Sequence, residues 1–267
     1  MTKIGKLIVI EGTDSSGKET QAKKLQQTLK DAGIKSEYIS FPRYETPTGR
    51  IVGECYLGKP RLAYGDPDGL LDTIKSIFPQ GSLDEIFKAH AIARHVLKNL
   101  PGQSWFADPT KLDPLTASLY YAADRREAAR DIFRILSSGI HLISNRYVES
   151  NMGHQGGKII NEAEREKLFE DLDLLEHGIL KLPRPDLVFF LHMPLEVAKK
   201  LNKERNKPQD AHESSSEHLK NAEEAYLQLA KLRGWTTIEC APDGYPPRSE
   251  DDIAKEISDK ILPVLSS

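Results

Sequence analysis

One segment near the start of the chain, LIVIEGTDSSGKET at residues 7–20, constrains the fold more than any other. Its apolar first part predicts a buried β-strand. A glycine-bounded turn follows, and then a helical pattern that begins at Lys18 and runs to Gly33. In such a strand–turn–helix unit, backbone N–H groups of the turn and the positive end of the helix bind phosphates, and the lysine reaches the β- and γ-phosphates. We therefore predict a nucleoside triphosphate site, with the ATP-binding candidates Gly12, Thr13, Ser15, Ser16, Gly17, Lys18, Glu19 and Thr20.

The overall charge limits the partners of the chain. Its 267 residues carry a formal net charge of -3, whereas general nucleic-acid and anionic-membrane binders need an excess of basic residues. No apolar stretch approaches the roughly 20 residues that cross a bilayer. Cys55 and Cys240 lie far apart without metal-site spacing, so we expect two reduced thiols. These features predict a soluble, cytoplasmic protein with no nucleic-acid or membrane partner.

Apolar runs and amphipathic stretches alternate along the chain. The runs predict buried strands at residues 7–10, 37–40, 141–144, 187–191 and 236–240. The stretches predict helices at residues 17–31, 114–137, 162–180, 194–205, 217–232 and 251–265. This alternation indicates an α/β fold of phosphate-loop type, with a doubly wound parallel sheet and the ligand at the carboxyl ends of its strands. We expect a single domain over residues 1–267.

Two segments interrupt this alternation. Residues 59–113 are predicted to be a helical insertion, with helices at residues 70–77 and 83–100 and apolar side chains that pack on the main body or on a neighbouring subunit. The polar stretch at residues 206–217 is predicted to be a mobile flap, and residues 201–217 together form a lid-like segment.

Arginines follow the ends of several predicted strands. Arg43 follows the second strand and Arg146 follows the third, while Arg125 lies in the long middle helix. Phosphoryl transfer depends mostly on positioning and on neutralising charge on the phosphate oxygens, which are tasks for arginine, lysine and magnesium. Beside a phosphate loop, these arginines therefore indicate a role in phosphoryl transfer.

Several motifs in order resemble the thymidylate kinase family and cover nearly the whole chain outside residues 59–113. They are EGTD through Gln21 at residues 11–21, FPRY at 41–44, PTG at 47–49, YAADR at 121–125, NRYVESN at 145–151, HQG at 154–156, PDL at 185–187, DAHE at 210–213 and Tyr226. The resemblance implies the strand order 2-3-1-4-5, a homodimer, and transfer of the ATP γ-phosphoryl group to dTMP with Mg2+.

The resemblance also assigns roles to single residues. Tyr121 corresponds to an aromatic ring that stacks on thymine, and Arg125 to an arginine that donates to a thymine carbonyl oxygen. His154 stands where relatives often carry a tyrosine that favours deoxyribose. Residues 201–207 correspond to a basic lid that relatives close over ATP, and we assign Arg205 to the migrating phosphoryl group, with Lys203 and Lys207 as alternatives. The catalytic candidates are Lys18, Asp14, Arg146 and Arg205. The substrate-binding candidates are Asp14, Phe41, Arg43, Tyr44, Tyr121, Arg125, Arg146, Ser150, Asn151, His154 and Gln155.

Two departures from the family pattern concern the metal. Glu19 replaces the usual Ser or Thr after Lys18, and Asn145 replaces an Asp that often precedes the Arg-Tyr pair. Either Glu19 takes over part of the metal-holding role, or Thr20 coordinates and Glu19 points to solvent. The metal candidates are Asp14, Glu19, Thr20 and Glu213.

Two other functions are consistent with these residues. His154 and the insertion leave room for a kinase that acts on another nucleoside monophosphate or on a nucleoside. Glu19 and Asn145 leave room for a catalytically silent nucleotide-binding subunit with a regulatory role, although the retained Lys18, Arg146 and Arg205 argue against it.

Overall fold

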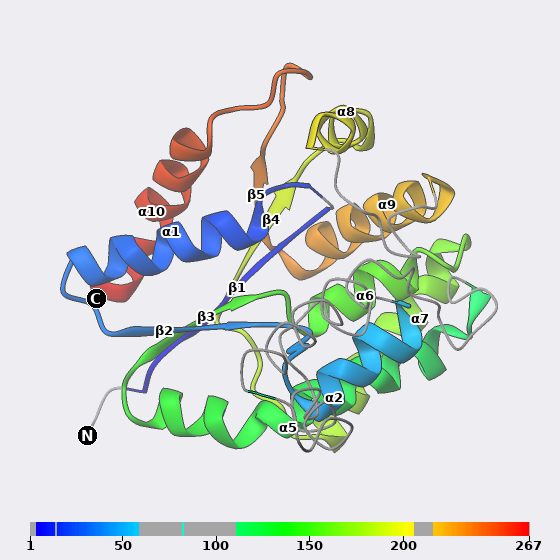
Figure 1. Ribbon diagram of the computed structural model, residues 1–267, viewed down its shortest axis with the longest axis horizontal. Helices are drawn as coiled ribbons and strands as arrows, with labels where there is room; N and C mark the ends of the chain where they lie inside the picture. Colours follow the sequence, from blue (N-terminus) through cyan, green and yellow to red (C-terminus); the bar gives the residue numbers. More distant parts are fainter. Residues whose placement is uncertain (1–3, 14, 59–81, 83–110, 206–215, 267) are drawn as a thin grey trace.

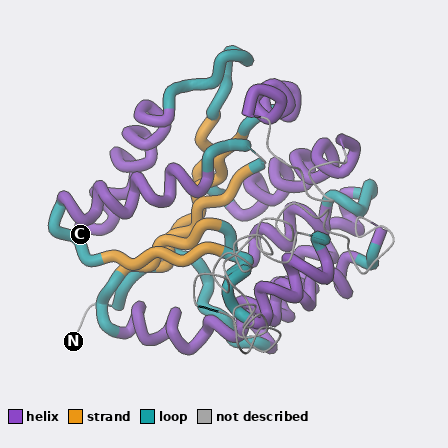
Figure 2. Tube along the Cα trace, in the orientation of Figure 1, coloured by secondary structure: helices purple, strands orange, loops and turns teal. Residues whose placement is uncertain are grey.

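The chain folds around a single parallel sheet. The computed structural model describes residues 4–13, 15–58, 82, 111–205 and 216–266, without the side chains of Arg205 and Ser266. Its strands lie in the order β2-β3-β1-β4-β5, and every neighbouring pair is parallel (Figures 1 and 2). Their bounds are β1 Leu7–Gly12, β2 Ser36–Ser40, β3 His141–Asn145, β4 Leu187–His192 and β5 Thr236–Glu239. The predicted strands and their order are therefore confirmed.

The central strand β1 faces two separate cores. Leu7 and Val9 pack on one side of the sheet with helices α5, α6, α7 and α9, whereas Ile8 and Ile10 pack on the other side with α1, α8 and α10 (Figure 1). Successive side chains of a strand point to opposite faces, so an uninterrupted apolar run is what a sheet covered on both faces requires. The doubly wound α/β class is confirmed.

The helices mostly follow the predicted stretches. Their bounds are α1 Lys18–Asp31, α2 Pro47–Arg50, the π-helical η1 Ile51–Tyr56, α5 Pro114–Ser137, α6 Val148–Gly156, α7 Glu162–Asp173, the π-helical η3 Leu174–Ile179, α8 Leu195–Arg205, α9 Ser216–Arg233 and α10 Glu250–Ser266. One prediction needs correction, because the single helix expected at residues 162–180 changes to π-helical geometry after Asp173. The helices predicted at residues 70–77 and 83–100, and residues 206–215 of the flap, lie outside the described residues.

Helix α6 is absent from the predictions, although it follows β3 directly. Its sequence VESNMGHQG is rich in residues with weak helix propensity, so the pattern alone does not reveal it. Packing on α9 stabilises it instead: a Cβ added at Gly153 would lie 2.4 Å from ring carbons of Tyr226. The missing side chain of Gly153 therefore allows the close approach of α6 and α9.

Candidate active site

The phosphate loop is anchored to the end of strand β4. Thr13 Oγ1 donates to the Met193 carbonyl oxygen at 2.8 Å and accepts from the Met193 backbone N–H at 3.0 Å. Gly17 precedes helix α1 with a φ of 80°, a conformation that glycine adopts at no steric cost. The loop thus enters α1 with the helix N-terminus at the carboxyl end of the sheet.

Lys18 folds back over this loop. Its side chain is buried, and Nζ donates to the Thr13 carbonyl oxygen at 2.8 Å. Ser15 Oγ donates to Asn202 Oδ1, so the loop also contacts helix α8 of the lid-like segment. The oxygen of Ser16 is buried and has no hydrogen-bond partner within the described residues. The loop therefore combines the buried ammonium group of Lys18 with the buried hydroxyl group of Ser16, which is available to a bound ligand.

The two residues after Lys18 lie in different surroundings. The Glu19 carboxylate pairs with Lys23 Nζ at 2.5 Å one turn along α1, and its side chain is 63% exposed. Thr20 is half-buried. Of the two hypotheses for the metal, this geometry favours the one in which Glu19 points to solvent.

Arg146 occupies a strained position directly after strand β3. Its φ is 65°, a left-handed conformation that L side chains rarely adopt. Its Nη1 lies 2.9 Å from His154 Nε2 and 3.5 Å from Ser150 Oγ, both on helix α6. His154 in turn stacks on His218 of α9, with ring centroids 5.9 Å apart. Strand β3 lies between β1 and β2, so this turn is beside the phosphate loop.

Glu11 is a buried carboxylate that holds the turn after β3. It accepts the Tyr147 backbone N–H at 2.9 Å, Ser150 Oγ at 2.8 Å and Tyr226 Oη at 3.2 Å. Burial raises the pKa of Glu11 above its ordinary value, although the positive charge of Arg146 opposes the shift. Glu11 is not among the predicted site residues. A lone carboxylate inside an apolar strand was the available signal, because such a group must find partners.

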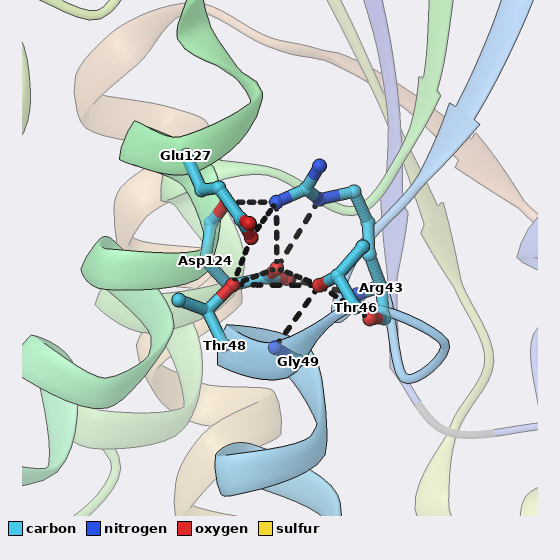
Figure 3. A network of polar contacts seen from close by, with 6 residues as sticks. All are labelled: Arg43, Thr46, Thr48, Gly49, Asp124 and Glu127. Carbon is cyan, nitrogen blue, oxygen red and sulfur yellow. Dashed lines mark hydrogen bonds and ion pairs between the residues drawn. The ribbon is translucent and has the colours of Figure 1, made fainter. Parts of the chain in front are cut away.

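Arg43 is held by carboxylates of helix α5 (Figure 3). Its Nε donates to Asp124 Oδ1 at 3.1 Å and its Nη2 to Glu127 Oε2 at 2.8 Å, while its backbone N–H donates to Asp124 Oδ2 at 2.8 Å. Thr46 and Thr48 also donate to Asp124 Oδ1. Asp124 therefore organises the whole segment that contains the FPRY motif.

Arg125 and Asn151 share one buried carboxylate. Arg125 Nε donates to Glu176 Oε2 at 2.8 Å and its Nη2 to Glu176 Oε1, while Asn151 Nδ2 donates to Glu176 Oε1 at 3.0 Å. The exposed fractions of the Arg125 and Glu176 side chains are 2% and 0%. The structure thus brings together two candidates for base recognition, through a residue that the sequence analysis does not single out.

Four other substrate-binding candidates also lie within the described residues. The Phe41 ring lies 5.9 Å from the Arg43 guanidinium carbon, and Tyr44 packs against the apolar cluster around Val52 and Tyr56. The Tyr121 ring meets Tyr56 edge-on at 5.7 Å. Gln155 is buried and its Oε1 has no partner within the described part of the chain. Asp14, Glu213 and the side chain of Arg205 lie outside the described residues.

Two features are absent from the described residues. No helix in that part of the chain is long and apolar enough to span a membrane. No group of three or more His, Cys, Asp or Glu residues there could hold a metal ion. Neither cysteine forms a disulfide within the same part, and burial raises the pKa of the Cys240 thiol to about 12.

A parallel sheet in the order 2-3-1-4-5 with a phosphate loop after its central strand has the architecture of a phosphate-loop nucleotide-binding fold. The family model "Thymidylate kinase" matches residues 10–62 and 103–245. The chain therefore belongs to the thymidylate kinase family and is a phosphotransferase.

Relatives and a solved structure agree with this assignment. A thymidylate kinase of Prochlorococcus marinus (strain NATL2A) is 25% identical over 267 residues, with 98% of this chain and 99% of that protein covered. The thymidylate kinase of Homo sapiens is 26% identical over 196 residues, with 73% of this chain and 65% of the human protein covered. The structure of a thymidylate kinase from Candida albicans shares the fold, with a TM-score of 0.63 and 22% identity over 97% of this chain and 92% of that one.

Proposed function

We propose that the chain transfers the γ-phosphoryl group of ATP to the 5′-phosphate of dTMP, giving dTDP and ADP. One observation carries the proposal: the loop around buried Lys18 and the turn that carries Arg146 follow neighbouring parallel strands. Register pairs Ile10 of β1 with Asn145 of β3, so both segments leave the sheet at the same edge. Membership of the thymidylate kinase family supports ATP as donor and dTMP as acceptor.

The donor would occupy the phosphate loop. Backbone N–H groups of the loop and the N-terminus of α1 would hold the phosphates, and Lys18 Nζ would exchange the Thr13 carbonyl for a phosphate oxygen. The link between Ser15 and Asn202 places helix α8 against the loop, which supports a lid role for the following segment with Arg205. Rate would come from in-line placement and charge neutralisation, without a protein nucleophile.

The acceptor would lie along β3, α5 and α6. Arg146, Arg43 and Tyr44 would hold its phosphate, while Tyr121 would stack on the base. The two carboxylates around Arg43 engage its Nε and Nη2, and its Nη1 donates to none of the residues drawn in Figure 3. Bidentate pairing of this kind fixes the plane of a guanidinium group, so Nη1 is presented in a constant direction.

Oxygen atoms near the loop are compatible with Mg2+. Ser16 Oγ and Asn145 Oδ1 are buried and have no partner within the described residues, and magnesium takes oxygen ligands while it keeps several waters. We propose that Thr20 and these oxygens hold the ion, with Asp14 and Glu213 as further candidates. When bound, the ion would neutralise charge on the phosphate oxygens.

A homodimer and a cytoplasmic location remain predictions. Leu115, Leu119 and Phe133 of α5 are 44%, 51% and 44% exposed. Leu119 and Phe133 lie 4 and 18 residues after Leu115, which places all three on one face of the helix. This face supports contact with a second copy of the chain. Light scattering tests it: Leu119→Lys should convert dimers to monomers, and an unchanged mass would place the interface elsewhere.

A coupled assay for ADP release tests the proposed function. Wild-type protein should form ADP with dTMP present and none without it, and Lys18→Ala should reduce the rate by about a thousandfold. Lys30→Ala, on the exposed end of the same helix, is the matched control and should remain active. Faster turnover with dUMP, dGMP or UMP than with dTMP would identify a different acceptor. No turnover with any acceptor would favour the catalytically silent alternative.

A further inference from the structure

Glu176 is a fully buried carboxylate to which the family motifs assign nothing. It accepts two donors from Arg125 and one from Asn151, so three hydrogen bonds converge on its oxygens. Its side chain is 0% exposed, and it lies in the π-helical segment η3. An unpaired buried carboxylate is costly, so Glu176 requires these partners just as they require it.

The backbone geometry around Glu176 is unusual. It lies in the π-helical segment η3, where the backbone N–H of Leu180 donates to the Leu175 carbonyl at 2.9 Å. The Glu176 carbonyl accepts the Leu182 backbone N–H at 3.0 Å, which closes the segment. Segment η3 follows α7 directly, and from it the Glu176 carboxylate reaches Arg125 of α5 and Asn151 of α6.

The network continues from Arg125 to the turn that carries Arg146. Arg125 Nη1 donates to the Tyr147 carbonyl oxygen at 3.2 Å, and Tyr147 is the residue directly after Arg146. Glu176 therefore contacts two candidates for base recognition. Arg125 links it to Tyr147, the neighbour of the arginine proposed to hold the acceptor phosphate.

The ion pair between Arg125 and Glu176 fixes the orientation of the guanidinium group more than it stabilises the fold. Burial opposes the charged form of Arg125, yet the adjacent Glu176 carboxylate raises the pKa of the guanidinium above its ordinary value. A buried ion pair adds little stability compared with an apolar pair of similar volume. Its bidentate geometry, in contrast, fixes the plane of the guanidinium group.

We propose that Glu176 is a positioning residue of the acceptor site, which holds Arg125 and Asn151 in the orientation that reads the base of the bound monophosphate. This inference rests on the proposed function. A thymine presents a carbonyl acceptor at the position where cytosine presents an amino donor. Arginine carries only donors, so an Arg125 held at constant orientation accepts thymine and rejects cytosine.

The variant Glu176→Gln tests the proposal, because it keeps the shape of the side chain and removes its charge. We expect the KM for dTMP to rise by about tenfold or more while kcat changes less. The KM for ATP should stay constant, and the preference for dTMP over dCMP should fall by about tenfold. Glu170→Gln, an exposed position on α7, is the matched control and should leave all of these values unchanged.

A second variant keeps the test decisive if Glu176→Gln fails to fold. The double variant Arg125→Met with Glu176→Leu removes both charges together, which buried pairs tolerate far better than loss of one partner. It should fold and bind ATP, and calorimetry should show dTMP binding weakened by about tenfold or more. Unchanged dTMP affinity in this variant, or unchanged base preference in Glu176→Gln, would overturn the inference. Absence of dTMP-dependent ADP formation in the wild type would instead refute the proposed function itself.

Discussion

The buried carboxyl of Glu149 in helix α6 predicts how the free energy of unfolding depends on pH. Its side chain is 6% exposed, and its Oε2 has no hydrogen-bond partner among the described residues. Burial, followed by the nearby charge of Glu11, raises the pKa of the Glu149 carboxyl to about 8 from an ordinary value of 4.5. The folded chain therefore keeps this proton at neutral pH, whereas the unfolded chain releases it.

The sign and size of the effect follow from this difference. Below pH 4.5 the carboxyl is protonated in both states, so folding is not opposed. Between pH 4.5 and about 8 the unfolded chain gains stability as it ionises, at about 1.4 kcal/mol per unit. The free energy of unfolding thus decreases as pH rises, by about 3 kcal/mol at pH 7, and the decrease levels off above pH 8.

Glu149→Gln should remove this dependence, because the amide is neutral at every pH. Urea unfolding should be measured at pH 5, 7 and 8.5 for the wild type, for Glu149→Gln and for the exposed control Glu170→Gln. The variant should gain stability relative to the wild type as pH rises, by about 4 kcal/mol between pH 5 and 8.5, whereas the control should show no such trend. The buried amide adds a constant offset of about 1 kcal/mol that does not vary with pH.

A difference between Glu149→Gln and wild type that stays constant over this pH range would refute the reasoning. It would mean that Glu149 is ionised in the folded chain. Titrating groups that do not interact with Glu149 are the same in both proteins, so their contributions cancel in the comparison.

Three further perturbations test other contacts. Glu19→Ala removes an exposed pair with Lys23, so it should change the free energy of unfolding by less than about 0.5 kcal/mol and leave the magnesium dependence of activity unchanged; a shifted dependence would restore Glu19 as a ligand. His192 forms hydrogen bonds with the carboxylates of Glu223 and Glu239, and the bond to Glu223 is the main cause of its raised pKa. The stability that this charged form contributes is therefore complete below pH 6.5 and is lost as pH rises through the pKa of the folded state. His192→Gln should therefore destabilise the protein more at pH 6 than at pH 9 in urea unfolding, and equal losses would exclude the charged form. Gly153→Ala places a Cβ against the Tyr226 ring and should lower stability by about 1 to 3 kcal/mol in thermal unfolding; no loss would mean that α6 and α9 separate at little cost.

Much of the fold was predictable because local patterns determine it. The apolar runs of β1 and β4 are buried on both faces, and amphipathic α1, α5 and α10 cover them, so residue type and position agree. Helix α6 and the π-helical η3 were not predictable in this way. Their geometry depends on tertiary contacts, such as Gly153 with Tyr226, that no local pattern encodes.

The candidate site likewise has a part that the sequence predicts and a part that it does not. The loop around Lys18 is contiguous in sequence, so its chemistry can be read directly. The carboxylates that hold the arginines come from distant positions: Glu176 lies 51 residues from Arg125, and Asp124 lies 81 residues from Arg43. Each would pass for a solvated surface acid in the sequence, and only the packing of α5 against its neighbours reveals the pairing.

The carboxylates around Arg43 also affect how a nucleotide first approaches the protein. Asp124 and Glu127 together outweigh the single positive charge of Arg43, and Glu127 is 42% exposed. This three-residue cluster therefore offers no net positive charge to an incoming dianion, and long-range attraction must come from other cations. Added salt should then accelerate or leave unchanged the encounter at this corner, in contrast to sites where unpaired arginines draw their ligand from solution.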